Sequence, residues 1–201
     1  YEAVRGTPAF AAAPEEVRTA ARLQTMQEAA AQAVHTEAFL QLYRALRAEG
    51  LAPVVVKGIV CRARYPQPDL RPSGDEDLYL TPEEMPRFHA VLLRAGFVLA
   101  EPERDYRTAH EARYVQPRTG LVVEGHWALF PTEYEVYTAL NAQLTGLEER
   151  AQDWETGGVT LRIPDPSDHL IFLLLHAFKH FVSSGVGVRQ LCDIALWMNY
   201  Y

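Results

Sequence analysis

The chain has 201 residues, a formal net charge of −7 at pH 7 and a sequence pI of about 5.5. Hydrophobic residues make up 48% and charged residues 22%, close to the average of globular proteins, which excludes a disordered or a fibrous protein. The acidic balance argues against nucleic acid as the main partner, because neutralising phosphates requires a basic surface.

The two cysteines, Cys61 and Cys192, are isolated and far apart, which favours reduced thiols over a disulfide framework or a zinc site. The longest strongly apolar run, residues 170–177, is far shorter than the roughly 20 residues that span a bilayer. Residues 1–30 contain no signal-peptide core. We therefore expect a cytoplasmic protein without a membrane role, whose natural chain extends beyond one or both ends of this sequence.

Hydrophobic periodicity, turn residues and capping residues predict the elements along the chain. In chain order we expect a helix over 15–49, a strand over 54–56, a short helix over 59–64, a strand over 75–80, a helix from Thr81 to near Gly96, strands over 113–116 and 121–127, a helix over 133–150, a strand over 159–163, a helix over about 168–182 and a second helix after Gly187.

Two local signals are particularly informative. Thr81-Pro82-Glu83-Glu84 combines a capping hydroxyl, a proline at the first helical position and early carboxylates, which predicts a helix start. The turn residues of segment 117–120 predict that the strands on either side of it form a hairpin.

The order of these elements predicts an α+β fold, with a small mixed β-sheet flanked by helices and a helical part at the C-terminal end. We expect three parts: an N-terminal helical segment over 1–50, an α/β core over 51–163, and a C-terminal helical part over 164–201 packed on the core.

The most informative residues lie on the strand over 75–80. Because side chains alternate along a strand, Asp75 and Asp77 point to one face, while Glu76 points to the other. Two like charges about 7 Å apart are unfavourable unless they are solvated or bridged by a cation, and carboxylate oxygens at that spacing suit magnesium. An Asp-x-Asp pair by itself is also typical of a solvated strand edge. The preceding Lys57-Gly58 turn, which offers a positive charge and an accessible backbone, favours a phosphate site.

Alternation on the strand over 121–127 places Glu124 and His126 on one face. Glu124 is a candidate for the third metal ligand, so that three carboxylates could hold two ions in a phosphoryl-transfer site. His126 could orient Glu124, or could simply satisfy a neighbouring carbonyl.

In combination these motifs resemble the uncharacterised nucleotidyltransferase family of the polymerase-β-like superfamily. The resemblance covers about residues 35–201, with low specificity in each single motif and high specificity in their combination. It is carried by the Lys57-Gly58 turn, the Tyr65-Pro66-Gln67-Pro68 loop, Arg71, Gly74-Asp75-Glu76-Asp77, Glu124-Gly125-His126-Trp127, and His176, Lys179, His180 and Asp193 in the helical part.

The resemblance implies a cleft for a nucleoside triphosphate, expected to be ATP, two magnesium ions, and transfer of a nucleoside monophosphate to an acceptor hydroxyl on an unknown small molecule, peptide or protein. It implies that Asp75, Asp77 and Glu124 are the catalytic metal ligands. It also implies that the nucleotide contacts Lys57, Gly58, Arg71, Ser73, Lys179 and His180.

Two departures from the family pattern support an alternative. Ile59 replaces a small residue, often serine, that would bind phosphate, and Glu76 stands at a normally apolar position where it would bury a charge. They motivate a catalytically silent binding or regulatory module, for example one of antitoxin type. Metal-dependent hydrolysis by the same carboxylates is a third reading.

Three residues of the helical part have alternative readings. His176 and His180 are four residues apart on a helix, a spacing compatible with zinc, although a structural role is favoured for them. For Asp193 we expect a capping role or an ion pair with Arg189, one helical turn away.

Overall fold

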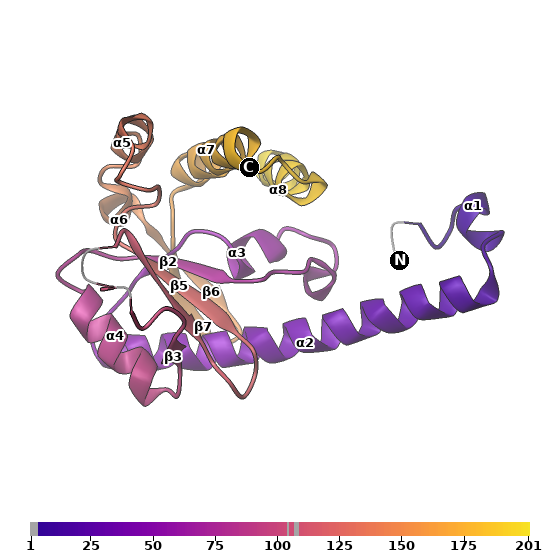
Figure 1. Cartoon of the computed structure of the whole chain (residues 1–201), viewed down its shortest axis with the longest axis horizontal. Helices are drawn as coiled ribbons and strands as arrows, with labels where there is room; N and C mark the ends of the chain where they lie inside the picture. The colour runs from indigo at the N-terminus through magenta and orange to yellow at the C-terminus, as the bar shows by residue number, and fades with distance from the viewer. Residues whose placement is uncertain (1–3, 104, 107–108) are drawn as a thin grey trace.

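The computed structural model describes residues 4–103, 105–106 and 109–201. The helices are α1 Pro8–Ala11, α2 Glu15–Ala48, α3 Ile59–Arg62, the 3-10 helix η1 Pro68–Leu70, α4 Met85–Arg94, α5 Glu135–Ala142, α6 Leu147–Arg150, α7 Pro166–Ser183 and α8 Val188–Tyr200. The strands are β1 Val54–Val55, β2 Glu76–Tyr79, β3 Val98–Leu99, β4 Glu111–Val115, β5 Val122–His126, β6 Gln152–Thr156 and β7 Val159–Ile163. Figure 1 shows α2 on one side of the sheet and α7 with α8 on the other.

The strands form one sheet in the order β3-β4-β5-β2-β1-β7-β6. Strand β2 is parallel to β5 and antiparallel to β1, and β1 is parallel to β7, so the sheet is mixed. Strands β4 and β5 form the predicted antiparallel hairpin. The α+β prediction is therefore confirmed. The three-part division of the chain stays a prediction, and the hydrophobic core takes residues from all three parts, such as Leu42, Val55 and Phe172.

Helix α2 follows the sequence prediction closely. Glu15 and Glu16 lie in its first turn and Arg47 in its last, where each charge complements the helix dipole. At about 1.5 Å per residue the helix is about 50 Å long. Its buried apolar residues lie between Ala38 and Leu46, and the N-terminal part extends beyond the body of the molecule, as Figure 1 shows.

The predicted start of the next long helix is wrong by four residues. Helix α4 begins at Met85, with a proline in its first turn. Thr81 lies before it in a turn closed by the N–H of Glu84 on the Thr81 carbonyl, 3.1 Å away. The Glu84 carboxylate accepts the Thr81 N–H at 3.0 Å. These capping residues therefore close a turn ahead of the helix.

The single helix predicted over 133–150 is also wrong. The segment contains two short helices, α5 and α6, separated at Gly146. Gly146 has a φ of +74°, in the left-handed region that interrupts a right-handed helix and that glycine adopts without steric cost. Strands β3 and β6 were not predicted. They are the two edge strands. Strand β3 has only two residues, and β6 is mostly polar, so neither shows a clear hydrophobic pattern.

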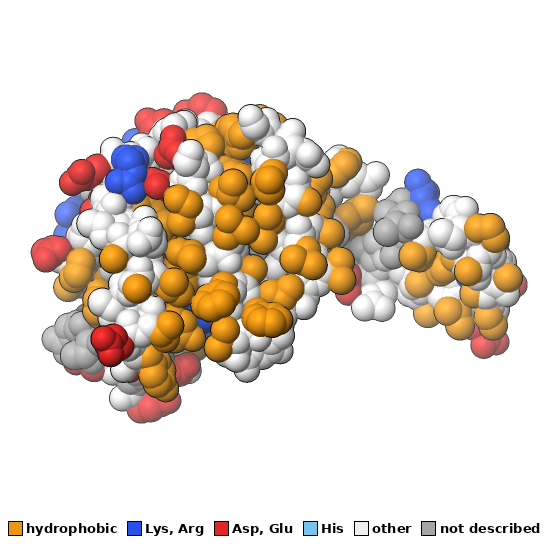
Figure 2. Space-filling model, turned by 90° about the horizontal axis from the view of Figure 1, so that it is seen from above, with side chains coloured by type: hydrophobic (Ala, Val, Ile, Leu, Met, Phe, Trp, Pro, Cys, Tyr) orange, Lys and Arg blue, Asp and Glu red, His pale blue; other side chains and the backbone are white. Residues whose placement is uncertain are grey.

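Helices α7 and α8 are apolar on more than their packed faces. Phe172 and Leu173 are buried, whereas large apolar side chains elsewhere on these helices are exposed. Figure 2, seen from the side on which α7 and α8 lie, shows apolar side chains gathered on this surface. The exposed ones on these two helices are Ile171, Leu174, Phe178, Phe181, Val182, Val188, Leu191, Met198 and Tyr200. Of the helices in the described part of the chain, none combines the length and the apolar character needed to cross a membrane.

Candidate active site

Strand pairing brings ionisable side chains from three strands to one face of the sheet. In the parallel pair β2–β5, Asp77 lies opposite Glu124. In the antiparallel pair β4–β5, Glu111 lies opposite His126 and Arg113 lies opposite Glu124. Because paired residues project on the same side of a sheet, these five side chains form a continuous polar surface.

Four of these side chains, those of Asp77, Glu111, Glu124 and His126, line one side of a cavity of about 180 Å³, and α7 lines another side. The lining residues are Val56, Lys57, Asp75, Asp77, Glu111, Glu124, His126, Leu129, Phe172, His176, Lys179 and His180. Of the nine site residues predicted from the sequence, the cavity contains Lys57, Asp75, Asp77, Glu124, Lys179 and His180.

Asp77 is the centre of the cluster. Its side chain is 7% exposed, and its two oxygens face different cations. Oδ1 lies 3.3 Å from Nε2 of His126, and Oδ2 lies 3.3 Å from Nζ of Lys57. Burial alone would raise the pKa of Asp77, but the charges of Lys57 and His126 lower it well below its usual value. Asp77 is therefore a carboxylate at neutral pH.

Lys57 joins the two aspartates. Its Nζ lies 3.7 Å from Oδ1 of Asp75 as well as close to Asp77. Burial would lower the pKa of Lys57, but the two carboxylates raise it above its usual value. A positive charge thus occupies the place between the aspartates where the sequence predicts a cation.

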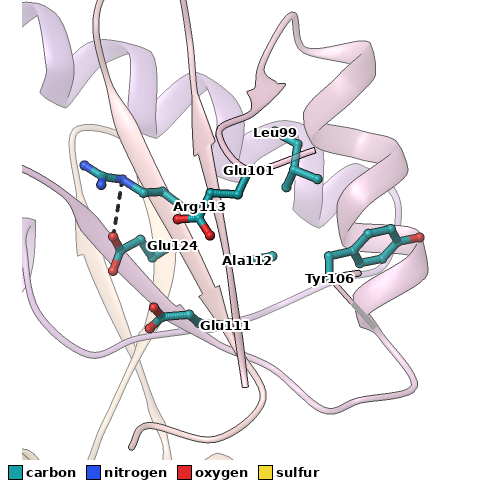
Figure 3. A pocket seen from close by; sticks show the side chains of 7 residues that line it. All are labelled: Leu99, Glu101, Tyr106, Glu111, Ala112, Arg113 and Glu124. Atoms are coloured by element: carbon teal, nitrogen blue, oxygen red, sulfur yellow. Dashed lines mark ion pairs between the residues drawn. The ribbon is translucent and has the colours of Figure 1, made fainter. Parts of the chain in front are cut away.

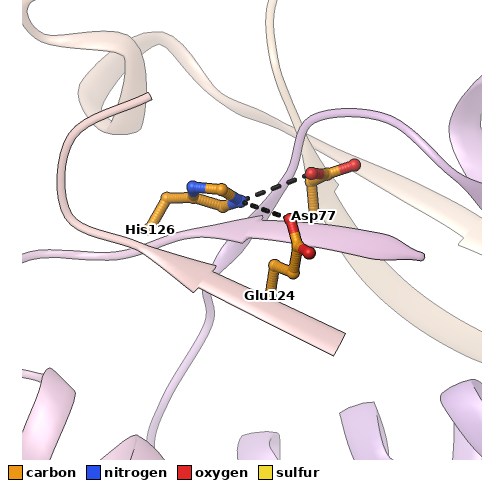
Figure 4. A group of neighbouring side chains, drawn as sticks. All are labelled: Asp77, Glu124 and His126. Carbon is orange, nitrogen blue, oxygen red and sulfur yellow. Dashed lines mark ion pairs between the residues drawn. The ribbon is translucent and has the colours of Figure 1, made fainter. Parts of the chain in front are cut away.

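Glu124 differs from Asp77 in its ionisation. Burial and the charge of Asp77 raise the pKa of Glu124 to about 7. Its Oε2 lies 3.7 Å from Nε2 of His126, and its Oε1 lies 3.6 Å from Nε of Arg113. One donor atom each from Asp77, Glu124 and His126 lies within 4.8 Å of the other two, close enough to share a metal ion (Figure 4). Among the described residues this group includes His126 and leaves out Asp75, which differs from the predicted set of ligands.

Sequence reasoning gave His126 a supporting role and missed Glu111. Nδ1 of His126 lies 3.4 Å from Oε2 of Glu111, which in turn lies 3.3 Å from Nε2 of His110. The contact with His110 lowers the pKa of Glu111 to about 2. Counting the register of the predicted hairpin back from its turn would have placed Glu111 opposite His126.

The carboxylate of Glu76 packs against Gly58, at a place that leaves no room for a side chain on residue 58. Gly58 has a φ of +55°, and a Cβ on it would lie 1.9 Å from Oε2 of Glu76. The same oxygen accepts the N–H of Ile59 at 2.8 Å, and Oε1 lies 2.6 Å from NH1 of buried Arg62. Glu76 is buried, as expected, and its charge is compensated by Arg62 and by the Ile59 N–H. Gly58 does not line the cavity, and Ile59 is buried and offers no hydroxyl to it.

Arg71 and Ser73 have contacts that lie away from the cavity. Arg71 is buried, and its Nε and NH2 donate to the two carboxylate oxygens of Asp193 at 2.7 and 2.6 Å. The expected Asp193–Arg189 ion pair is therefore wrong, and Arg189 instead donates to the carbonyl of Pro72. The hydroxyl of Ser73 donates to the backbone carbonyl of Asp75. Neither predicted nucleotide contact lines the cavity.

Helix α7 provides the wall opposite the carboxylates. Lys179 and His180 both line the cavity, where they can face an anionic ligand. His176 lies between them and the core, with its ring centroid 4.6 Å from that of His180 and 5.6 Å from that of Phe172. Burial and the charge of Lys57 lower the pKa of His176 to about 3, so its ring is neutral.

A smaller cavity of about 90 Å³ opens next to the first and shares Glu111 and Glu124 with it. Its other lining residues are Leu99, Glu101, Tyr106, Ala112 and Arg113, as Figure 3 shows. The two carboxylates thus separate a larger space near Lys57 from a smaller one near Arg113.

An acidic cavity with lysines on its walls offers oxygen donors for cations and positive charges for phosphates. The chain belongs to the uncharacterised nucleotidyltransferase family, whose sequence profile matches residues 1–201. The resemblance found over residues 35–201 is confirmed, and the match also includes the N-terminal helices. No curated protein and no solved structure matches the chain.

The free energy of unfolding of the metal-free protein should fall between pH 4.5 and 7, because Glu124 ionises in that range. Its pKa is raised from 4.5 to about 7 on folding, so its contribution is fully present below pH 4.5 and is lost as the pH rises through 7. Glu124→Gln cannot ionise. Its free energy of unfolding relative to wild type should therefore be about 3 kcal/mol higher at pH 8 than at pH 4.5. Urea unfolding in a chelator at both pH values measures this. Glu83→Gln, at an exposed position, is the control, and an unchanged pH dependence in Glu124→Gln would contradict the prediction.

Proposed function

We propose that the protein is a magnesium-dependent nucleotidyltransferase, which moves a nucleoside monophosphate from a nucleoside triphosphate, expected to be ATP, to an acceptor hydroxyl. The observation that carries the proposal is the convergence of Asp75, Asp77 and Glu124 with Lys57 and Lys179 in one cavity. Family membership supports nucleotidyl transfer in general.

The residues of the cavity suit a divalent ion. Among the described residues Oδ2 of Asp77 is buried without a hydrogen-bond partner, and it lies 3.3 Å from the Lys57 ammonium, so it already faces a cation. Carboxylate oxygens are the ligands that magnesium prefers. Asp75, Asp77 and Glu124 would hold the ions, which when bound lower the pKa of an attacking hydroxyl and stabilise the leaving pyrophosphate.

The chain's own residues would bind and orient the nucleotide. We assign the triphosphate to the larger cavity, where Lys57 and Lys179 can neutralise its charge and His180 can donate a hydrogen bond. We assign the acceptor to the smaller cavity, because it shares Glu111 and Glu124 with the larger one and thus leads to the carboxylates. For Gly58, Arg71 and Ser73 the contacts described above favour structural roles. The cytoplasmic location stays a prediction that rests on the two free cysteines.

Incubation of the protein with labelled triphosphate, magnesium and a cell lysate tests the proposal. Wild type should label an acceptor and release pyrophosphate, whereas Asp75→Ala/Asp77→Ala should do neither. Magnesium-dependent triphosphate binding without pyrophosphate release would contradict transfer and support the silent binding module, which Ile59 still motivates because it brings no hydroxyl. Release of product without an acceptor would instead indicate hydrolysis.

A further inference from the structure

The imidazole of His126 has an unusual environment for a buried histidine. The residue is 6% exposed, and neither ring nitrogen has a hydrogen-bond partner among the described residues. Buried polar groups are nearly always hydrogen-bonded, so an unpartnered one requires an explanation. Carboxylates approach both nitrogens at 3.3 to 3.7 Å without the geometry of a hydrogen bond.

The two ring nitrogens face different surroundings. Nε2 is directed to the cavity, between Oδ1 of Asp77 and Oε2 of Glu124 (Figure 4). Nδ1 faces Oε2 of Glu111 on the neighbouring strand. In metal sites a ligating histidine usually has its second nitrogen held by a carboxylate, which fixes the ring and raises its basicity. His126 has this arrangement, because Glu111 lies next to Nδ1 while Nε2 faces the cavity.

The distances from Nε2 of His126 to the two carboxylates fit a shared metal ion. With ligand bonds of about 2.1 Å, neighbouring donors of an octahedral ion lie about 3.0 Å apart and opposite donors about 4.2 Å apart. The distances from Nε2 to the two carboxylates, 3.3 and 3.7 Å, lie between these limits. Small movements of the side chains would therefore complete the coordination.

We infer that His126 is a direct metal ligand through Nε2, together with Asp77 and Glu124, and that this position selects a first-row transition ion such as Mn²⁺ over Mg²⁺. The inference rests on the proposed function, because it names the class of ion that this site takes. Carboxylates suit both ions, but an imidazole nitrogen favours transition metals. Carboxylate oxygens without an imidazole, such as those of Asp75, are the donors suited to Mg²⁺.

Pulsed electron paramagnetic resonance of bound Mn²⁺ tests the inference, because a ligating imidazole produces a nitrogen-14 modulation. Wild type should show this modulation and should bind Mn²⁺ at least about tenfold more tightly than Mg²⁺ in competition. His126→Gln should lose the modulation and about 10- to 100-fold of its Mn²⁺ affinity, while its Mg²⁺ affinity changes much less. His176→Gln and His180→Gln, from the opposite wall, should keep both properties.

A second variant covers the case in which His126→Gln does not fold, as judged by circular dichroism. Glu111→Gln keeps the imidazole, so it should retain the modulation with weaker Mn²⁺ binding. A wild-type spectrum without nitrogen modulation, or a modulation lost in His176→Gln, would overturn the inference.

Transfer with Mg²⁺ is measured in parallel. Transfer without nitrogen modulation overturns the inference and leaves the proposed function intact, whereas modulation without transfer supports the inference and overturns the proposed function.

Discussion

Replacement of Asp77 by Asn is expected to lower the rate of nucleotidyl transfer by about 10²- to 10³-fold or more. Asp77 is the residue whose two oxygens face both cationic positions, that of Lys57 and that of His126. Asn keeps the shape of the side chain and removes its charge. A metal ion bound by either oxygen of residue 77 would therefore lose a charged ligand. Single-turnover transfer of a labelled nucleotide at saturating magnesium measures the effect.

Asp75→Asn provides the matched comparison. Asp75 is 31% exposed and its carboxylate contacts Lys57, so its replacement should reduce the rate less than that of Asp77. Asp69→Asn, on an exposed stretch outside the cavity, should leave the rate unchanged. A larger loss in Asp75→Asn than in Asp77→Asn would contradict the central position that the structure assigns to Asp77.

Arg62→Met is expected to lower the free energy of unfolding by about 3 to 5 kcal/mol. Arg62 and Glu76 form an ion pair at 2.6 Å with side chains 2% and 1% exposed. Removal of the guanidinium leaves a buried carboxylate whose remaining hydrogen-bond partner among the described residues is the Ile59 N–H. Urea unfolding at pH 7 measures the loss.

A double variant separates the charge from the packing. Arg62→Met/Glu76→Gln removes both charges and keeps an acceptor for the Ile59 N–H, so it should be more stable than Arg62→Met alone. The exposed pair Arg94–Glu49, at 2.8 Å, is the control, and Arg94→Met should cost no more than about 1 kcal/mol. Equal losses of unfolding free energy in Arg62→Met and Arg94→Met would contradict a stabilising role for the buried Arg62–Glu76 pair.

Local sequence pattern was sufficient for most elements of the fold. Helix α2, the hairpin of β4 and β5, strand β7 and helices α7 and α8 were expected from periodicity and turn residues. The failures have local physical reasons. Gly146 adopts a left-handed conformation inside an otherwise helical pattern, and the edge strand β6 is polar because it faces solvent. Residues 81–84 close a turn instead of starting a helix.

The sequence by itself determined which carboxylates share a face of their strand, because alternation along a strand depends only on neighbouring residues. It placed Asp75 with Asp77, and Glu124 with His126, before any strand pairing was known. Only the tertiary structure decided which of them meet. The parallel register of β2 with β5 brings Asp77 to Glu124, and the antiparallel register of β4 adds Glu111.

The tertiary structure also reassigned charged residues that the sequence had given to the nucleotide or to a neighbour. Arg71, expected at the nucleotide, pairs with Asp193, which is 122 residues away and was expected to pair with Arg189. The buried charge of Glu76 likewise has a partner, Arg62, that only the tertiary structure reveals. Such pairs depend on which buried charges packing brings together, since an unpaired buried charge is costly. Alternation indicates the face on which a side chain lies, whereas register and packing determine whether it meets a ligand or another side chain.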